Sequence, residues 1–515
     1  MNFEMIQDLF ESANLEPGIP MRHILTAGIL TVLISPILVG CDGDFLNVSP
    51  SDQLAPDNFY RDASDAESAV NAAYDPLQPL YRNPWSHTTS GASDDVDIYN
   101  AVALPVNNFS FSANLSRFDQ VWQSSYQGVF RANLVLQNVP DIDMDQALKD
   151  RILGEARFLR ALYYWHLTTY FGEVPLVTEA NPTDRSAGEV PKSPVEDIYD
   201  LMISDLQEAK NLLPTRSELS DEELGRATNG AAQALLGKVY LYNENYASAE
   251  QELEAVINSG EYELIPEFSN INMIDNDQES IFEVQYSSAS GESSIRAYYN
   301  LPQGHGGFGN RLPEQDLVDE FEDYNGPDPN DNFDNRDPRL YYSVFREGDF
   351  YDSMEPEFKS SWTETGYAMK KGIFPVTRDW TNMPLNEDLI RLGDVYLMAA
   401  EAAILKGGAT SSDKAKAINW INKVRDRVNM PTYPDSDSPY SVDQTSSQQQ
   451  IFEAIVHERR VELALEFHRF NDLRRWELAA EELGEFGYQS PKHRYFPIPQ
   501  EEVDANPELD QNPNY

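Results

Sequence analysis

Cysteine is almost absent from this chain, since Cys41 is the only one among 515 residues. A single cysteine excludes an intramolecular disulfide and any metal site built from cysteines. Long apolar runs are equally scarce, and the 17 residues from Ile24 to Gly40 form the only one. With 41% hydrophobic and 11% aromatic residues, the chain can still bury a sizeable core, so wholesale disorder is excluded.

Basic residues are also few. The 38 Lys and Arg face 86 Asp and Glu, which gives a formal net charge of −48. A surface this negative repels phosphate backbones, so nucleic acid is not expected as a partner, and strongly acidic ligands are disfavoured for the same reason. Only 12 of the 38 are lysines, and a high acid load with few lysines indicates a salt-rich habitat, where ions screen the self-repulsion.

The apolar run from Ile24 to Gly40 has the features of a secretory signal. Arg22 and His23 precede it, it is shorter than the roughly 20 residues of a spanning helix, and it ends in Leu38-Val39-Gly40-Cys41. This ending is typical of a bacterial lipobox, so we expect Cys41 to be lipidated and to become the new N-terminus. Residues 1–40 are then an upstream extension and a signal peptide that is removed, and residues 41–62 a lipidated tether.

Residues 63–515 are predicted to form one mostly helical domain. Capping signals at Ser64 and Ser193 open two helices with apolar stripes. Two helix-turn-helix patterns, near residues 228–262 and 388–428, resemble tetratricopeptide hairpins, although no strict 34-residue period is present. Between about residues 263 and 385 the helical pattern lapses, and Gly, Pro, Asn and aromatics accumulate around short extended runs. We interpret this segment as a loop-rich insertion carried by the helical scaffold, the kind of place where binding surfaces occur.

Searches for catalytic and metal motifs fail, so no catalytic residue, cofactor or metal is predicted. Residues 304–309 satisfy GxGxxG, but no strand leads into them and Pro313 follows, which indicates a loop and not a dinucleotide site. Glu458, Glu462 and Glu466 share a helix face among several arginines, and structural ion pairs explain them better than acid catalysis. The acidic loop of Asp328 to Asp334 departs from the EF-hand pattern at Phe333, and whether it holds calcium stays open.

Five segments together resemble one family, the SusD/RagB outer-membrane nutrient-binding lipoproteins. The segments are the lipobox cysteine Cys41, Glu155 to Ala161 with Tyr170 to Leu176, Arg391 to Ala402, Glu458 to Trp476, and the tail from Phe496 to Pro499 with Gln511 to Tyr515. They occur in the family's order and span essentially the whole mature chain. Gly393 replaces the usual alanine, which is a change between small residues.

The resemblance implies a helical fold with tetratricopeptide-like hairpins and a binding role without catalysis. It also implies a lipoprotein on the surface of the outer membrane. There it would capture a glycan, or in some members a peptide, and deliver it to a SusC-like TonB-dependent transporter. Because the family's ligand residues vary, few of them can be carried over.

The ligand-binding residues are predicted from aromatic side chains that lack helical spacing. A neutral sugar polymer needs flat aromatic faces and a few oriented polar groups. Two regions supply them, the loop after the first helix and the loop-rich insertion. The predicted set is Tyr81, Arg82, Trp85, Asp94, Tyr298, Tyr299 and Trp362.

Three other functions stay open at this point. A peptide-binding member of the same family would need a deeper and more apolar cleft. A lipid-anchored glycosidase would need two carboxylates about 5–10 Å apart in a cleft. A scaffold that binds only proteins is disfavoured by the long aromatic-rich insertion.

Overall fold

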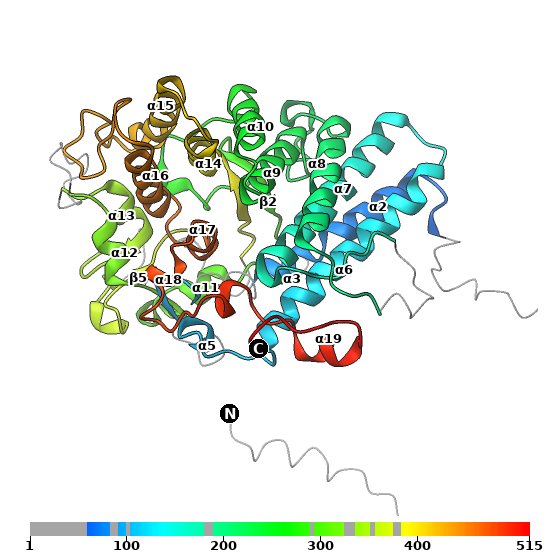
Figure 1. The fold of residues 1–515 in the computed structure, drawn as a ribbon, viewed down its shortest axis with the longest axis horizontal. Helices are drawn as coiled ribbons and strands as arrows, with labels where there is room; N and C mark the ends of the chain where they lie inside the picture. Colours follow the sequence, from blue (N-terminus) through cyan, green and yellow to red (C-terminus); the bar gives the residue numbers. More distant parts are fainter. Residues whose placement is uncertain are drawn as a thin grey trace, which may run out of the picture. The chain divides into compact units, whose positions relative to one another are not determined.

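The computed structural model describes residues 59–82, 91–98, 104–179, 189–288, 293–323, 335–350, 356–373 and 383–515 (Figure 1). Within these residues the architecture is mostly helical, as predicted from the sequence. None of the described helices is both long and apolar enough to cross a membrane.

The scaffold is a row of helices in which each packs against the next along the chain (Figure 1). Its members are α6 (Ser116–Asn138), α7 (Gln146–Phe171), α8 (Val195–Leu212), α9 (Asn229–Tyr242), α10 (Tyr246–Asn258), α14 (Leu392–Leu405), α15 (Ser411–Arg427) and α16 (Gln448–Glu462). The pairs α9–α10 and α14–α15 are helical hairpins, so the prediction of a hairpin scaffold is confirmed. Helix α2 (Ala63–Tyr74) packs on α6 and α7, and α3 (Leu77–Arg82) packs on α6.

Close packing within the α9–α10 hairpin depends on a small residue. A Cβ atom added to Gly237 of α9 would lie 2.6 Å from Cγ of Leu253 on α10, which is far inside contact distance. Helix α9 opens at Thr228, whose hydroxyl accepts a hydrogen bond from the Ala231 N–H, and α10 opens at Asn245 in the same way. Local capping therefore fixes where each helix begins, and the glycine permits their close approach.

The capping residues at two other helices differ from the sequence prediction. Asp62, and not Ser64, caps α2, because its carboxylate accepts from the N–H groups of Ser64 and Asp65. Helix α8 was expected to be capped by Ser193, but Pro194 occupies its N-cap position and no side chain caps the first turn. Ser193 instead bridges to Val174 through its backbone.

The segment between α10 and α14 holds short elements joined by loops, and one of its strands, β3, pairs with β1, which precedes α6 in the chain. Three two-stranded antiparallel sheets occur among the described residues, β1–β3, β2–β6 and β4–β5. The strands are β1 (Val96–Ile98), β2 (Ser280–Val284), β3 (Arg311–Pro313), β4 (Val344–Phe345), β5 (Ala368–Met369) and β6 (Glu387–Arg391). The short helices are α11 (Arg296–Asn300), α12 (Gln315–Glu320) and α13 (Pro338–Ser343), of which α12 and α13 contact α16.

The remaining helices are short and lie near the ends of the described chain. They are α5 (Leu104–Asn107), α17 (Arg469–Arg475), α18 (Ala479–Glu482) and α19 (Gln500–Ala505).

Buried ion pairs fasten the insertion to α14 and α16. Arg339, fully buried on α13, pairs with Glu458 at 2.5 Å and with Glu462 at 3.2 Å. Arg391 pairs with Glu462 and Glu466, both at 2.7 Å. The prediction that these glutamates are structural is confirmed, since each is occupied by arginine. Removing one partner of such a buried pair costs about 3–5 kcal/mol, because the other charge is left uncompensated.

Candidate ligand-binding site

An aromatic cluster forms where helix α11 meets the loop that follows it. Tyr298 and Tyr299 on α11 are both half-buried. The ring centroid of Phe308 lies 4.5 Å from that of Tyr298, edge to face, and 5.5 Å from that of Tyr299, stacked. The Phe308 side chain is 45% exposed. The cluster therefore presents aromatic surface to solvent, which is what a sugar ring requires.

Glycines shape the loop that holds Phe308 in place. Gly306 and Gly309 have φ values of +89° and +59°, which favour glycine. A Cβ on Gly307 would lie 2.2 Å from the carbonyl oxygen of Leu301, so only glycine fits this close approach. The N–H of Phe308 donates to the carbonyl of Tyr298 at 2.9 Å, which folds the loop back onto α11. The GxGxxG pattern thus builds a tight loop, and no dinucleotide-binding helix follows it.

Trp362 packs against the same loop, at Gly304 and His305. It ends the 3₁₀ turn η9 (Ser360–Trp362), and it is half-buried against an apolar cluster that includes Leu301 and Phe358. Its indole rests on Gly304, since a Cβ at that position would lie 2.2 Å from the indole Cδ2. The His305 ring meets the indole edge to face, with centroids 5.1 Å apart. Contacts with the apolar cluster, Gly304 and His305 therefore fix the orientation of the indole.

A surface pocket of about 190 Å³ adjoins the indole. Apart from Trp362, its polar groups are the Gln303 amide, the hydroxyls of Ser361 and Thr363, and the Glu364 carboxylate. The Thr363 hydroxyl is buried and makes no hydrogen bond within the described residues. Gly309 and Leu312 complete the lining. One aromatic face beside several uncharged donors and acceptors suits the C–H face and hydroxyls of a sugar.

The structure corrects the placement of Tyr81 and Asp94 in exposed loops. Tyr81 belongs to helix α3 and is 7% exposed, with its hydroxyl hydrogen-bonded to Nε2 of His166. Asp94 is 3% exposed, and its carboxylate pairs with Arg469 at 2.7 Å and with Arg460 at 3.1 Å. Tyr81 is unavailable to a ligand because it is buried. Asp94 is unavailable because it is buried and its carboxylate is paired with two arginines.

The other predicted positions fall into two groups. Arg82 is exposed in the last turn of α3. Trp85, the lipidation residue Cys41 and the acidic loop of Asp328 to Asp334 lie outside the described residues. Sequence reasoning missed Phe308, Gln303 and Thr363. Of these, only Phe308 had a readable signal, as an aromatic residue flanked by glycines in a polar loop.

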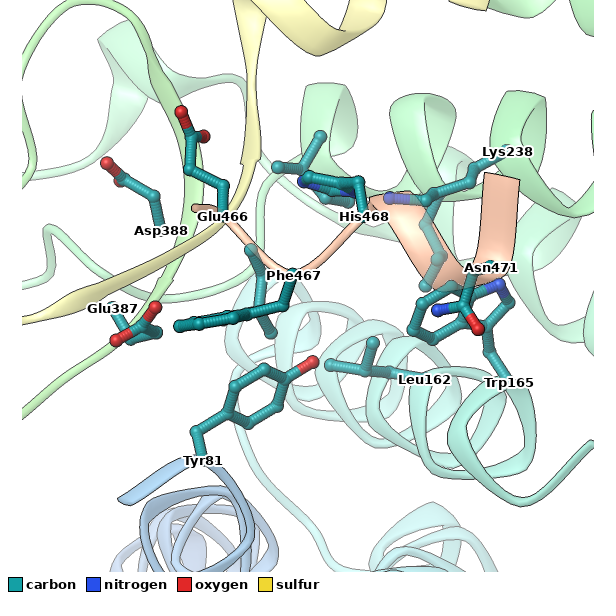
Figure 2. Close-up of a pocket in the computed structure, with 13 residues that line it drawn as sticks. Tyr81, Leu162, Trp165, Lys238, Glu387, Asp388, Glu466, Phe467, His468 and Asn471 are labelled. Carbon is teal, nitrogen blue, oxygen red and sulfur yellow. The ribbon is translucent and has the colours of Figure 1, made fainter. Parts of the chain in front are cut away.

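A second pocket, near Tyr81, is interior and small (Figure 2). Its volume is about 30 Å³, which suits one water molecule and not a sugar. Figure 2 shows the rings of Phe467 and Tyr81 beside one another, with Glu387 on one side. Burial raises the pKa of Glu387, which pairs with Arg296 at 3.0 Å, and lowers the pKa of His468 to about 4, so His468 favours its neutral form in this interior.

Among the described residues, one group of side chains has the spacing of a metal site, Glu322, His457 and Glu458. Its donors are already engaged. His457 contacts Glu320 through Nδ1 at 2.5 Å and Glu322 through Nε2 at 2.9 Å. Arg425 pairs with Glu322 at 2.7 Å and with Glu458 at 2.9 Å. The Arg425 guanidinium thus takes the position that a metal ion would occupy, and the three side chains fit ion pairs better than a metal site.

Comparison with known proteins agrees with this architecture. The family model described as "SusD family" matches residues 278–515, and the one described as "Starch-binding associating with outer membrane" matches residues 44–241. SusD-like protein P2 of Formosa agariphila is 26% identical over 514 residues, which cover 93% of this chain and 97% of that protein.

Solved structures show the same fold. A structure titled "Laminarin binding SusD-like protein" is 30% identical, with a TM-score of 0.73, and the match covers 88% of this chain and all of that one. A SusD superfamily protein from Bacteroides vulgatus is 27% identical, with a TM-score of 0.75, and the match covers 89% of this chain and all of that one. The chain therefore belongs to the SusD/RagB family, and the resemblance found in the sequence is confirmed.

Proposed function

We propose that this protein is a cell-surface lipoprotein that binds an oligosaccharide or polysaccharide and delivers it to a SusC-like TonB-dependent transporter. The observation that carries the binding role is the Trp362 indole, held against Gly304 beside a pocket of hydroxyl and amide groups. A family model described as starch-binding and a structural relative titled laminarin-binding support a glycan as ligand.

The chemistry of the pocket favours a neutral glycan. Among the described residues, its lining contains no Lys or Arg, and Glu364 is its one charged residue. A net charge of −48 further disfavours an anionic polymer at this position. A single carboxylate in the lining also argues against a glycosidase, which needs a pair. A peptide ligand would want a more apolar cleft than this one, so it remains the second candidate.

The anchor and the partner follow from the same proposal. Lipidation at Cys41 would hold the protein on the outer membrane, but a lipid tether alone cannot move a ligand inward. Docking on a transporter barrel supplies that route. We expect a SusC-like protein to co-purify with the native protein in mild detergent, and recovery of the protein alone at native expression would count against the transporter part.

Binding is tested by isothermal titration of the full chain with laminarin, followed by a glycan array if laminarin fails. Trp362→Ala should weaken binding about 5- to 150-fold, on the scale of 1–3 kcal/mol for stacking on an aromatic ring. The matched control is Phe130→Ala, which removes an aromatic side chain that is 39% exposed on α6. Equal affinity for the array-identified glycan in the Trp362 variant and the native protein would refute this site.

A further inference from the structure

A larger pocket, of about 370 Å³, lies on the helical scaffold and has a different chemistry. The C-terminal end of α7, the first turn of α8, the turn between α9 and α10, and α17 all contribute to it. Its lining includes three arginines, Arg474, Arg475 and Arg494, and three tyrosines, Tyr199, Tyr242 and Tyr495. In a chain with 86 acidic and 38 basic residues, such a concentration of arginine calls for a physical explanation.

Arg474 is a buried cation without a counter-ion among the described residues. It is 8% exposed, and its three hydrogen bonds go to neutral acceptors, the carbonyls of Arg494 and Thr169 and the side-chain oxygen of Asn471. Its Nε makes no hydrogen bond within the part of the chain that the structure describes. Burial lowers the pKa of Arg474, and nearby tyrosines, among them Tyr495 and Tyr242, offset part of that shift. A buried charge of this kind is costly unless an anion approaches it.

The neighbouring arginines on α16 and α17 behave differently. Arg459 pairs with Asp394 and Asp472, and Arg475 pairs with Glu401 and Asp472. The charge of Arg475 is therefore neutralised within the protein. Arg474, in contrast, has no carboxylate partner among the described residues, and it lines the pocket.

Arg494 adds a second available positive charge. Within the described part of the chain its one ion pair is with Glu477 at 3.2 Å, and the two side chains are 49% and 77% exposed, so water screens the pair strongly. Val195 and Glu196 place the start of α8 at the same pocket, but Glu196 and Asp197 in its first turn already meet the partial positive charge of this helix end, so the arginines carry the argument.

Two acidic residues also border the pocket. Glu196 and Glu244 are both exposed, and solvated charges are weak competitors for a buried guanidinium. The negative charge of the whole protein acts over a Debye length of only about 8 Å at physiological salt, so it does not cancel charges in contact.

We propose that this pocket binds a compact oxyanion, a carboxylate or sulfate ester carried by an acidic sugar, between Arg474 and Arg494. A guanidinium recognises both groups through charge-assisted N–H donors, and on Arg474 the Nε–H is the donor that no acceptor among the described residues takes up. The volume falls in the range of small-molecule sites, and the tyrosines offer rings for a sugar face. The preference for an oxyanion rests on the arginines, whereas the sugar as its carrier rests on the proposed function.

The test is isothermal titration of the full chain with glucuronate, glucose 6-sulfate, inorganic sulfate and glucose. We expect glucuronate or glucose 6-sulfate to bind, glucose to show no binding, and added NaCl to weaken the acidic sugars. Arg494→Glu should lower their affinity at least about 5-fold. Arg474→Gln should lower it about 10- to 150-fold if the variant folds, and Arg494→Glu carries the test if it does not. Arg61→Gln, which alters an exposed surface arginine, is the matched control.

The outcomes separate this site from the one at Trp362. Absence of binding by both acidic sugars, or unchanged affinity in Arg494→Glu, overturns the oxyanion site even if laminarin binds. Inorganic sulfate binding as tightly as the acidic sugars overturns the sugar as carrier. Loss of glucuronate binding in Arg494→Glu with unchanged laminarin affinity is the result expected for two independent sites.

Discussion

Replacing Gly304 by alanine is expected to displace the Trp362 indole and so to weaken glycan binding without touching any group that contacts the ligand. The added Cβ would lie 2.2, 2.3 and 2.4 Å from three ring atoms of the indole. An ordinary contact begins near 3.4 Å, so the ring must shift by about 1.2 Å. Gly304 is not one of the glycines with a positive φ, so its backbone conformation tolerates alanine.

The cost divides between stability and affinity. Overpacking of this kind destabilises the fold by about 1–3 kcal/mol. Loss of the stacked geometry removes about 1–3 kcal/mol of binding, which is a roughly 5- to 150-fold change in Kd. The assay is isothermal titration with laminarin, or with the array-identified glycan, with thermal unfolding measured in parallel.

Two further variants isolate the cause. Gly306→Ala strains the same loop through its φ of +89°, but it meets no atom within 4 Å, so affinity should stay near that of the native protein. Combining Gly304→Ala with Trp362→Ala should cost no more affinity than Trp362→Ala alone, because the two changes act on one contact. A folded Gly304→Ala variant with native affinity would refute the role assigned to the indole.

Three further predictions concern the anchor, the buried charges and the pH dependence. Cys41→Ser should abolish acyl labelling and release the protein from membranes, and a labelled, membrane-bound variant would contradict lipidation. Asp94→Ala should destabilise the fold by up to about 3–5 kcal/mol in a denaturant titration, with glycan affinity unchanged, because Arg469 then keeps only Glu482, at 3.8 Å, whereas Arg460 keeps Asp95; Asp65→Ala, which breaks an exposed pair with Arg61, should cost far less. Burial acts to lower the pKa of His457, but hydrogen bonds to Glu320 and Glu322 outweigh it and raise the pKa, so this stabilisation is complete below about pH 6.5 and is lost as pH rises through the higher folded value. Melting temperatures across that range should fall more steeply in the native protein than in His457→Gln, and parallel curves would contradict the assignment.

The sequence by itself determined the helical scaffold and the family. Apolar residues at helical spacing are a local property, so the hairpin of α9 and α10 was predictable from residues within about 30 positions of each other. The loop character of residues 304–309 was predictable as well, because glycine and proline act on their own backbone. The placement of Trp362 in the insertion followed from the absence of helical spacing around it.

Only the tertiary structure decided which charged and aromatic side chains are free. Asp94 pairs with arginines that are more than 360 residues away along the chain, and no local pattern reveals such a partner. Arg474 and Arg475 are adjacent in sequence, yet one is neutralised by carboxylates and the other contacts neutral acceptors. The Trp362 pocket depends on a close approach between Gly304 and the indole, 58 residues apart. Long-range packing determines burial and charge pairing, and these two quantities decide what each site can bind.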